Sequence, residues 1–257
     1  MITRLLRHGL VDSTNERALA AIASGEARHG DVHVAEGQSA GRGRLGRGWS
    51  SPRGEGLYLS LVLLPGTVPN PAALTMAAGL GVLAGVHSLG AKAARLKWPN
   101  DVLAPDATGA DAKLAGILVE TRGLDPARPH AVVGVGLNVA QRSFPPELVR
   151  ERAVTSLARL GLAVEREAAL EALLAALASR MVEACETPAT SAGDYARALG
   201  LVGRAVRVRD ARGERRGRLL GLTLAGLELT LESGARERVA LEHVQGLEAL
   251  DGAVEIP

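Results

Sequence analysis

Residues 31–65 read DVHVAEGQSAGRGRLGRGWSSPRGEGLYLSLVLLP, and this stretch decides the fold. Its two ends, DVHVAEGQ and LYLSLVLLP, have the alternating or continuous apolar pattern of strands. The segment between them, residues 37–56, is dense in Gly, Ser and Arg and has no period, which predicts an exposed loop. That loop carries Arg42, Arg44 and Arg47 on a backbone made flexible by glycines.

Helices and strands are predicted on both sides of that loop. A capping segment, Asp12-Ser13-Thr14-Asn15, precedes apolar positions at helical spacing. The predicted helices cover residues 14–24, 72–90, 166–185 (long and amphipathic) and 194–199 (short). Further strands are predicted over 94–104 (entering a turn at 99–101), 113–123 and 130–140, with a turn-rich insertion at 105–112.

The pattern of apolar and polar residues changes after Thr187-Pro188. Short alternating runs separated by Gly turns, AVRVRD, RGRLLGLT, GLELTLE and RERVALEHV, predict a small β-barrel. The sequence therefore predicts a mixed domain over 1–199 and a small β-barrel domain over 200–257.

Composition indicates a folded chain without a strong overall charge. Apolar residues make up 47% of the 257 residues and charged residues 23%, and the net charge of +2 argues against nucleic acid as the main partner. The single Cys185 excludes an internal disulfide, and the histidines show no metal-ligand spacing. The N-terminus lacks the apolar core of a signal peptide, and 71–86 is typical of a buried helix too short to span a bilayer, so we expect a cytoplasmic protein.

Two stretches match dinucleotide-binding fingerprints by letter, Gly41-x-Gly43-x-x-Gly46 and Gly134-x-Gly136-x-x-Val139-Ala140. A Rossmann site needs such glycines between a strand and a helix whose N-terminus faces the pyrophosphate. Prolines follow both matches, in WSSPRGEG and QRSFPPE, and argue against that helix. No GxxxxGK[ST] loop is present either, so we do not expect a nicotinamide, flavin or P-loop site.

The Arg/Gly loop leaves two interpretations open at this point. It is typical of a solvated basic loop that contacts RNA phosphate, and also of a loop that closes over a carboxylate or phosphate with guanidinium forks. Lysine usage adds a hint, because the chain has 27 Arg but only Lys92, Lys97 and Lys113. Lys97 opens KWPND and Lys113 opens KLAGILVE. A lysine kept at these two positions in an arginine-rich chain hints at a site that requires a compact ammonium and not a planar guanidinium.

Five short motifs occur in order over residues 12–140: SerThrAsn at 13–15, GQSAGRGRLGRGW at 37–49, KWPNDVL at 97–103, KLAGILVE at 113–120 and VGVGLNV at 133–139. Together they resemble the successive signature motifs of biotin-protein ligases. The resemblance implies an α+β fold in which a mixed sheet is flanked by helices, as in class II synthetase-like catalytic domains, with an SH3-like C-terminal barrel.

The resemblance also implies a reaction and its partners. A biotin-protein ligase (EC 6.3.4.15) joins biotin to the α-phosphate of MgATP, releases pyrophosphate, and passes biotin from biotinyl-5′-AMP to a lysine of a biotin carboxyl carrier protein, such as that of acetyl-CoA carboxylase. It implies Mg²⁺ only as part of MgATP, and no membrane partner. It suggests a homodimer. Only eleven residues precede Asp12, so we expect the ligase-only form without the N-terminal DNA-binding domain, and hence no DNA binding.

Roles for individual residues follow from the resemblance alone. Lys113, with Arg42 and Arg44, would be catalytic, and Trp49 would form a lid over the intermediate. Contacts to biotin would come from Ser13, Thr14, Asn15, Gln38, Gly41, Arg42, Gly43, Arg44, Lys113, Gly116 and Gly134. Contacts to ATP or the adenylate would come from Arg44, Arg47, Trp49, Lys97, Asn100, Asp101, Gly136 and Asn138, and Asp101 would serve as a metal or structural carboxylate. Helix capping is the alternative for Ser13 and Thr14, and turn formation for Asn100.

The sequence departs from the family pattern at three places. Leu45 stands where many members have another Arg, the insertion between Asp101 and Lys113 is longer than usual, and residues 239–250 read VALEHVQGLEAL, so we assign no nucleotide role to the barrel. The nearest alternative function is a lipoate- or octanoate-transferring ligase. The KWPND motif and the two arginines of Gly41-Arg-Gly-Arg44 in the Arg/Gly loop favour biotin over lipoate. A non-enzymatic RNA-binding module is the rival from another class, but the loop has no aromatic platform.

Overall fold

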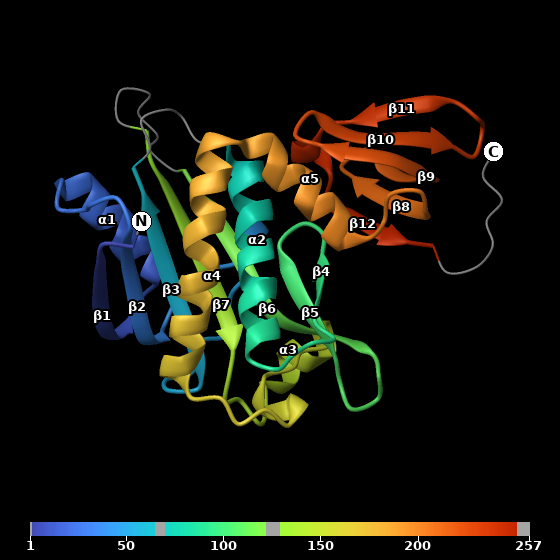
Figure 1. Cartoon of the computed structure of the whole chain (residues 1–257). Helices are drawn as coiled ribbons and strands as arrows, with labels where there is room; N and C mark the ends of the chain where they lie inside the picture. The colour runs from blue at the N-terminus through green and yellow to red at the C-terminus, as the bar shows by residue number, and fades with distance from the viewer. Residues whose placement is uncertain (1, 65–69, 122–128, 251–257) are drawn as a thin grey trace.

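The computed structural model describes residues 2–64, 70–121 and 129–250 of the chain. Its centre is a seven-stranded mixed sheet in the order β1-β2-β3-β7-β6-β5-β4, in which β1 and β2 are parallel and the other neighbours antiparallel (Figure 1). The strands are β1 (Arg4–Val11), β2 (Asp31–Gln38), β3 (Gly56–Leu63), β4 (Arg95–Lys97), β5 (Asp101–Pro105), β6 (Asp111–Glu120) and β7 (Ala131–Asn138).

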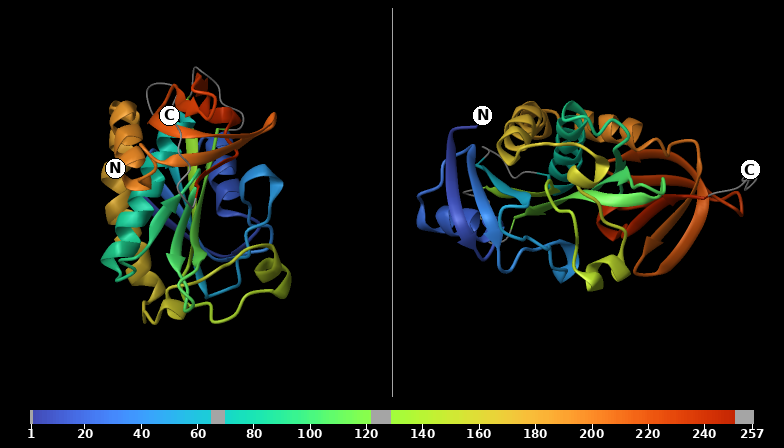
Figure 2. Two further views of the ribbon diagram at one scale, coloured as in Figure 1. Left: turned by 90° about the vertical axis from the view of Figure 1, so that its right-hand side faces the viewer. Right: turned by 90° about the horizontal axis from the view of Figure 1, so that it is seen from below.

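Helices cover the two faces of this sheet unequally. The long helices α2 (Pro71–Ser88) and α4 (Arg166–Glu186) lie side by side on one face, and α5 (Pro188–Leu199) follows α4 (Figures 1 and 2). Helices α2 and α4 approach closely because Gly81 and Gly85 have no side chain where Leu177 and Leu173 pack. The opposite face carries α1 (Thr14–Ser24), the Arg/Gly loop and the short α3 (Pro146–Glu151).

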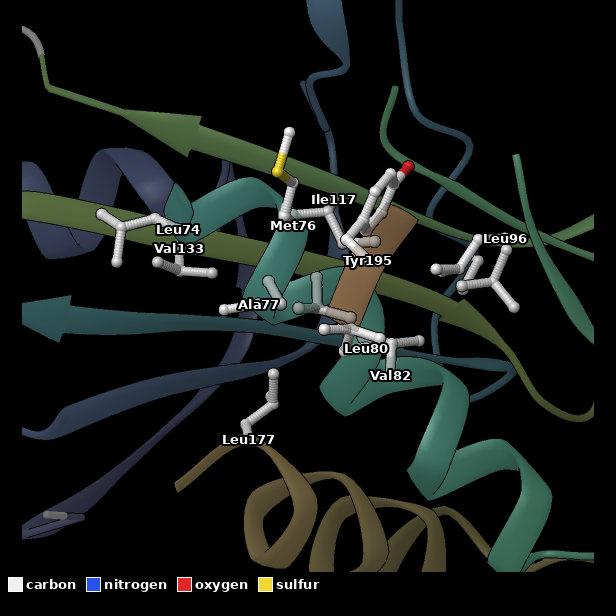
Figure 3. Packing of buried hydrophobic residues seen from close by; sticks show 14 of the residues in the cluster. Leu74, Met76, Ala77, Leu80, Val82, Leu96, Ile117, Val133, Leu177 and Tyr195 are labelled. Atoms are coloured by element: carbon white, nitrogen blue, oxygen red, sulfur yellow. The ribbon is translucent and has the colours of Figure 1, made fainter. Parts of the chain in front are cut away.

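The main core lies between the sheet and the long helices. Leu74, Met76 and Ala77 of α2 pack with Ile117 and Val133 of the sheet, and Figure 3 shows this cluster from close by. Helix α2 is long and apolar enough to cross a membrane by length and composition alone, but 61% of it is buried inside the fold. That burial is what a core helix of a globular protein requires, and it confirms the predicted buried helix, whereas the expectation that the helix is too short to span a bilayer is wrong.

The C-terminal segment forms a second, five-stranded antiparallel sheet in the order β11-β10-β9-β8-β12. Its strands are β8 (Ala205–Asp210), β9 (Gly213–Thr223), β10 (Gly226–Leu231), β11 (Arg236–Val239) and β12 (Gly246–Ala249). The predicted boundary at residue 200 falls between α5 and β8. The division into two domains stays a prediction, because buried residues of both sheets belong to one continuous cluster.

Most predicted elements are confirmed, three predictions need correction, and two strands were missed. The single strand predicted over 94–104 is the hairpin β4–β5, with a cis Trp98–Pro99 bond in its turn. The helix predicted over 194–199 begins at Pro188. The prolines after β7 do not prevent a helix, since α3 has Pro146 at its first position, where a missing N–H costs nothing. Strands β1 and β12 were not predicted. A dinucleotide-binding site is still not expected here, because Gly134 and Gly136 lie inside β7 and not between a strand and a helix.

Candidate active site

A cleft opens on the face of the sheet opposite α2 and α4. It lies between the N-terminus of α1, the Arg/Gly loop and strands β5, β6 and β7. The lining residues are Ser13, Thr14, Asn15, Gln38, Arg42, Gly43, Arg44, Arg47, Gly48, Trp49, Leu59, Asn100, Asp101, Lys113, Gly116, Ile117, Leu118, Gly134, Val135, Gly136 and Arg152.

The floor of the cleft is bare backbone. Gly134 and Gly136 alternate with buried Val133 and Val135 along β7, so over residues 133–136 one face of the strand packs in the core and the other carries no side chain. A Cβ on Gly134 would collide with the Asn15 amide. A ligand or side chain can therefore lie directly on the sheet, which is the usual reason for glycine inside a strand.

A bulge in β6 directs Lys113 into the cleft. The pairing of β5 with β6 shifts between Val102 and Leu103, which face Ala115 and Lys113, so Leu114 is the extra residue. Lys113 and Gly116 then share a face although they are three positions apart, and a Cβ on Gly116 would lie 3.2 Å from the Lys113 ammonium. The bulge therefore sets the position of the only Lys that lines the described cleft.

Lys113 is a buried cation with one carboxylate partner. Its side chain is 12% exposed, and Nζ lies 2.6 Å from Oδ1 of Asp101 on β5. Burial lowers the pKa of Lys113, Asp101 opposes that shift, and the positive charges of Arg152 and Arg47 add to it. Asp101 thus balances the charge of an ammonium that stays aimed into the cleft.

The cleft has a cationic end around Lys113. Arg44 and Arg47 come from the loop and Arg152 from the segment after α3. Burial lowers the pKa of the half-buried Arg44 guanidinium, while nearby Asp101 raises it. Leu45, between Arg44 and Arg47, is 78% exposed with φ of 57°, so its side chain faces solvent.

The opposite end of the cleft is polar and neutral. Gln38 Oε1 accepts the backbone N–H of Thr14 at 2.8 Å, and Gln38 Nε2 donates to Ser51 Oγ at 2.8 Å. The Ser60 hydroxyl lies 2.8 Å from Thr14 Oγ1 and donates to Asn15 Oδ1 at 2.5 Å. Ser13 stands at the N-cap of α1 but makes no side-chain capping bond, so the capping alternative is wrong for that side chain.

Arg42 is held by two carboxylates. Its guanidinium lies 2.5 Å from Glu16 of α1 and 2.5 Å from Glu120 at the end of β6. Glu120 also accepts a hydrogen bond from Asn15 Nδ2 at 2.8 Å. This cluster, which we call the Arg42 latch (Arg42, Glu16, Glu120 and Asn15), ties the loop to the sheet beside the neutral end of the cleft.

Trp49 lies over the glycine floor. A Cβ on Gly116 would be 2.9 Å from the indole, and one on Gly136 would collide with it. The Lys113 ammonium is 5.1 Å from the ring centroid, within the range of a cation–π contact. The indole N–H is buried and has no hydrogen-bond partner among the described residues, so the ring covers the cleft without being fixed in it by a hydrogen bond.

Three of the predicted site residues do not line the cleft, and their roles stay predictions. Gly41 lies in the loop, where a Cβ would collide with Ser51 and Gln38. Lys97 pairs with Glu248 of β12 at 3.5 Å. Asn138 donates to the Thr155 carbonyl at 2.9 Å and lines a small neighbouring cavity with Trp49 and Lys113. All the other predicted site residues line the cleft.

Sequence reasoning missed several residues of the site. Glu16 and Glu120 hold the loop, and Ser51 and Ser60 fix the neutral end. Arg152 completes the cationic end from outside the five motifs. Glu120 closes the quoted KLAGILVE motif, so a carboxylate there was a visible signal, whereas nothing local singles out Arg152.

A dedicated metal cage is not formed by the described residues, since no group of three or more His, Cys, Asp or Glu side chains is placed to hold an ion. Asp101 is the one carboxylate among the described lining residues.

The chain is similar to known proteins of one family both in sequence and in fold. Residues 9–138 match the biotin/lipoate A/B protein ligase family. The chain is 42% identical over 202 residues to the biotin–[acetyl-CoA-carboxylase] ligase of Mycobacterium tuberculosis, covering 76% of this chain and 71% of that protein. It is 40% identical over 158 residues to the bifunctional ligase/repressor BirA of Salmonella typhimurium, covering 61% of this chain and 47% of that protein, so it spans about half of that relative's length.

A solved structure agrees over nearly the whole chain. The biotin protein ligase from Aquifex aeolicus in complex with biotin and ATP superposes with a TM-score of 0.78 at 28% identity, covering 97% of this chain and 100% of that chain. The expected α+β fold, with a mixed sheet flanked by helices and a small C-terminal sheet, is confirmed.

Proposed function

This chain belongs to the biotin/lipoate A/B protein ligase family, and on that premise we propose that it is a biotin-protein ligase. It activates biotin with MgATP and then transfers biotin to a lysine of a biotin carboxyl carrier protein. The observation that carries the proposal is Lys113, a buried ammonium held by Asp101 between a neutral polar end and a cationic end of one cleft.

In the first step a carboxylate oxygen of biotin attacks the α-phosphorus of ATP. The bond from that phosphorus to the bridging oxygen breaks, and pyrophosphate leaves with the electron pair. Two anions must meet, and like unit charges at 4 Å repel by about 4 kcal/mol at an effective dielectric near 20. Lys113 and Arg44 offset that repulsion as fixed positive charges, so the step needs cations more than it needs an acid or base.

The neutral end of the cleft suits the ureido head of biotin. The ureido group has N–H donors and a carbonyl acceptor, and Ser13, Thr14, Asn15 and Gln38 offer hydroxyl and amide partners without a charge. The glycine floor lets the flat ring system lie on the sheet, and Trp49 covers it from above. Because the Arg42 latch occupies the guanidinium of Arg42, we assign the carboxylate to Lys113 and Arg44 and give Arg42 the task of holding the loop.

In the second step the neutral amine of a carrier lysine attacks the acyl carbon of biotinyl-5′-AMP. AMP leaves with the electron pair, and the new amide nitrogen loses a proton to solvent. Covering of the mixed anhydride by Trp49 limits its hydrolysis before the carrier arrives. Mg²⁺ would enter with ATP as part of the substrate, and Asp101 would stay paired with Lys113.

Labelling of a carrier domain tests this proposal. The purified protein with biotin and MgATP should attach biotin to the lysine of a biotin carboxyl carrier domain, and lipoate should not replace biotin. Labelling with lipoate alone would contradict the biotin assignment. A cytoplasmic location, a homodimer and the lack of DNA binding remain predictions.

A further inference from the structure

Arg152 comes from a segment that lies outside the family match at residues 9–138. Arg152 directly follows α3, and its backbone N–H donates to the Leu148 carbonyl of that helix. The next residues run along β6, where Lys113 N–H donates to the Ala153 carbonyl at 2.9 Å and Thr155 N–H donates to the Lys113 carbonyl at 3.0 Å. The segment is therefore fixed to the backbone of Lys113 itself.

The Arg152 side chain reaches the cleft beside Lys113. It is 24% exposed and lines both the main cleft and the small cavity behind Trp49. Its charge is close enough to lower the pKa of Lys113. Two cations placed together in a partly buried site repel one another, and they are best satisfied by an anion between them.

The present partner of Arg152 is weakly held. Arg152 pairs with Glu151 at 2.6 Å, but the Glu151 side chain is 55% exposed. Exposed ion pairs contribute little to stability, so the guanidinium can turn toward a ligand at small cost.

The position of Arg152 indicates which anion it meets. The end of the cleft near α1 is neutral, and Arg152 lies at the other end with Lys113 and Arg47. A guanidinium fork matches the geometry of phosphate oxygens. Negative charge on the leaving pyrophosphate grows as the bond to the α-phosphorus breaks, so a cation at this end acts on the nucleotide more than on biotin.

We propose that Arg152 is a further substrate-binding residue, which contacts the phosphate tail of ATP and the departing pyrophosphate. The proposal rests on the function proposed above and adds a residue from outside the five motifs. Arg150 of α3 is the matched control, because it is an exposed Arg two positions away that does not line the cleft.

The kinetic test compares three variants by the initial rate of pyrophosphate release. Arg152→Ala should raise the KM for ATP about tenfold or more, as expected for a lost charge-assisted hydrogen bond, and change the KM for biotin less than twofold. Arg152→Lys should recover part of the loss, and Arg150→Ala should behave as wild type. A KM for ATP within twofold of wild type in Arg152→Ala, or an equal rise in both KM values, would overturn the proposal.

A binding test keeps the proposal separate from the reaction. Titration calorimetry with magnesium pyrophosphate alone, on variants that first show a wild-type circular dichroism spectrum, needs no catalysis. Binding should weaken about tenfold in Arg152→Ala and in Arg152→Gln but not in Arg150→Ala, and equal binding in all four proteins would refute the contact. If wild type bound pyrophosphate through Arg152 but released none with biotin, the proposed function would fail and the contact would stand.

Discussion

Replacing Glu120 with Gln should release the Arg/Gly loop from the sheet. The Glu120 carboxylate is 11% exposed and accepts from Arg42 at 2.5 Å and from Asn15 at 2.8 Å. Gln keeps the shape but removes the charge and turns an amide N–H₂ toward one of these donors. Hydrogen bonds to charged groups contribute about 1.5–3 kcal/mol each, and Arg42 keeps Glu16, so we expect a loss of about 2–3 kcal/mol in the free energy of unfolding.

Glu16→Gln is the matched control, because it removes the other carboxylate of the Arg42 latch. The Glu16 side chain is 35% exposed, so solvent screens its pair with Arg42. Such a pair contributes roughly 0–1 kcal/mol. The difference in burial between the two glutamates therefore predicts a clear difference between the two variants.

Thermal unfolding and limited trypsin digestion check this prediction together. For a chain of this size, Glu120→Gln should lower Tm by roughly 4–12 °C and Glu16→Gln by about 0–4 °C. Cleavage after Arg42, Arg44 or Arg47 should be faster in Glu120→Gln than in Glu16→Gln, and the KM for biotin should rise in the same order. Equal shifts in both variants, or unchanged cleavage in Glu120→Gln, would show that the latch does not hold the loop.

Three further predictions test the site and the fold. Lys113→Arg should keep Tm within about 2 °C but lower biotin-dependent pyrophosphate release at least ~100-fold, since a planar fork cannot replace a compact ammonium; a full-rate variant would remove Lys113 from its role. Gly136→Ala should slow the same release about tenfold or more because its Cβ collides with Trp49, whereas Gly9→Ala, with open space around it, should not, and equal rates would contradict a floor that needs glycine. Burial and His8 lower the pKa of His33 to about 4, so below pH 6.5 the unfolded chain binds a proton that the folded chain does not. The free energy of unfolding of the wild type should therefore fall by up to about 3 kcal/mol as pH drops from 6.5 to 4. Denaturant titrations that give the same pH dependence of this free energy for wild type and His33→Leu would refute the linkage.

Local patterns predicted those parts of the fold that local physics determines. The helix of residues 14–24 and the strand of residues 31–38 appear within the predicted bounds, because capping, apolar spacing and alternation act over a few residues. Strand β1, RLLRHGLV, was not predicted because Arg4, Arg7 and His8 give an edge strand a polar pattern. Its place depends on parallel pairing with β2, twenty-seven positions away.

The site likewise has parts that the sequence motifs predicted and parts that depend on tertiary structure. The motifs located Lys113, the glycine floor and the neutral end, but the direction of the Lys113 side chain depends on the bulge at Leu114, which has no sequence signature. Arg152 and Glu16 join the site only through tertiary contacts, so their charges could not be told from ordinary surface charges in the sequence. The two carboxylates beside Arg42, those of Glu16 and Glu120, support our proposal that Arg42 holds the loop instead of binding the biotin carboxylate.

The most direct test of the central claim is the release of pyrophosphate from MgATP by the wild-type protein with biotin or lipoate as the only carboxylic acid. We predict release that requires biotin, saturates with its concentration, and is not supported by lipoate. Release that is equal with lipoate, or that is absent with biotin, would contradict the assignment of this cleft to biotin activation.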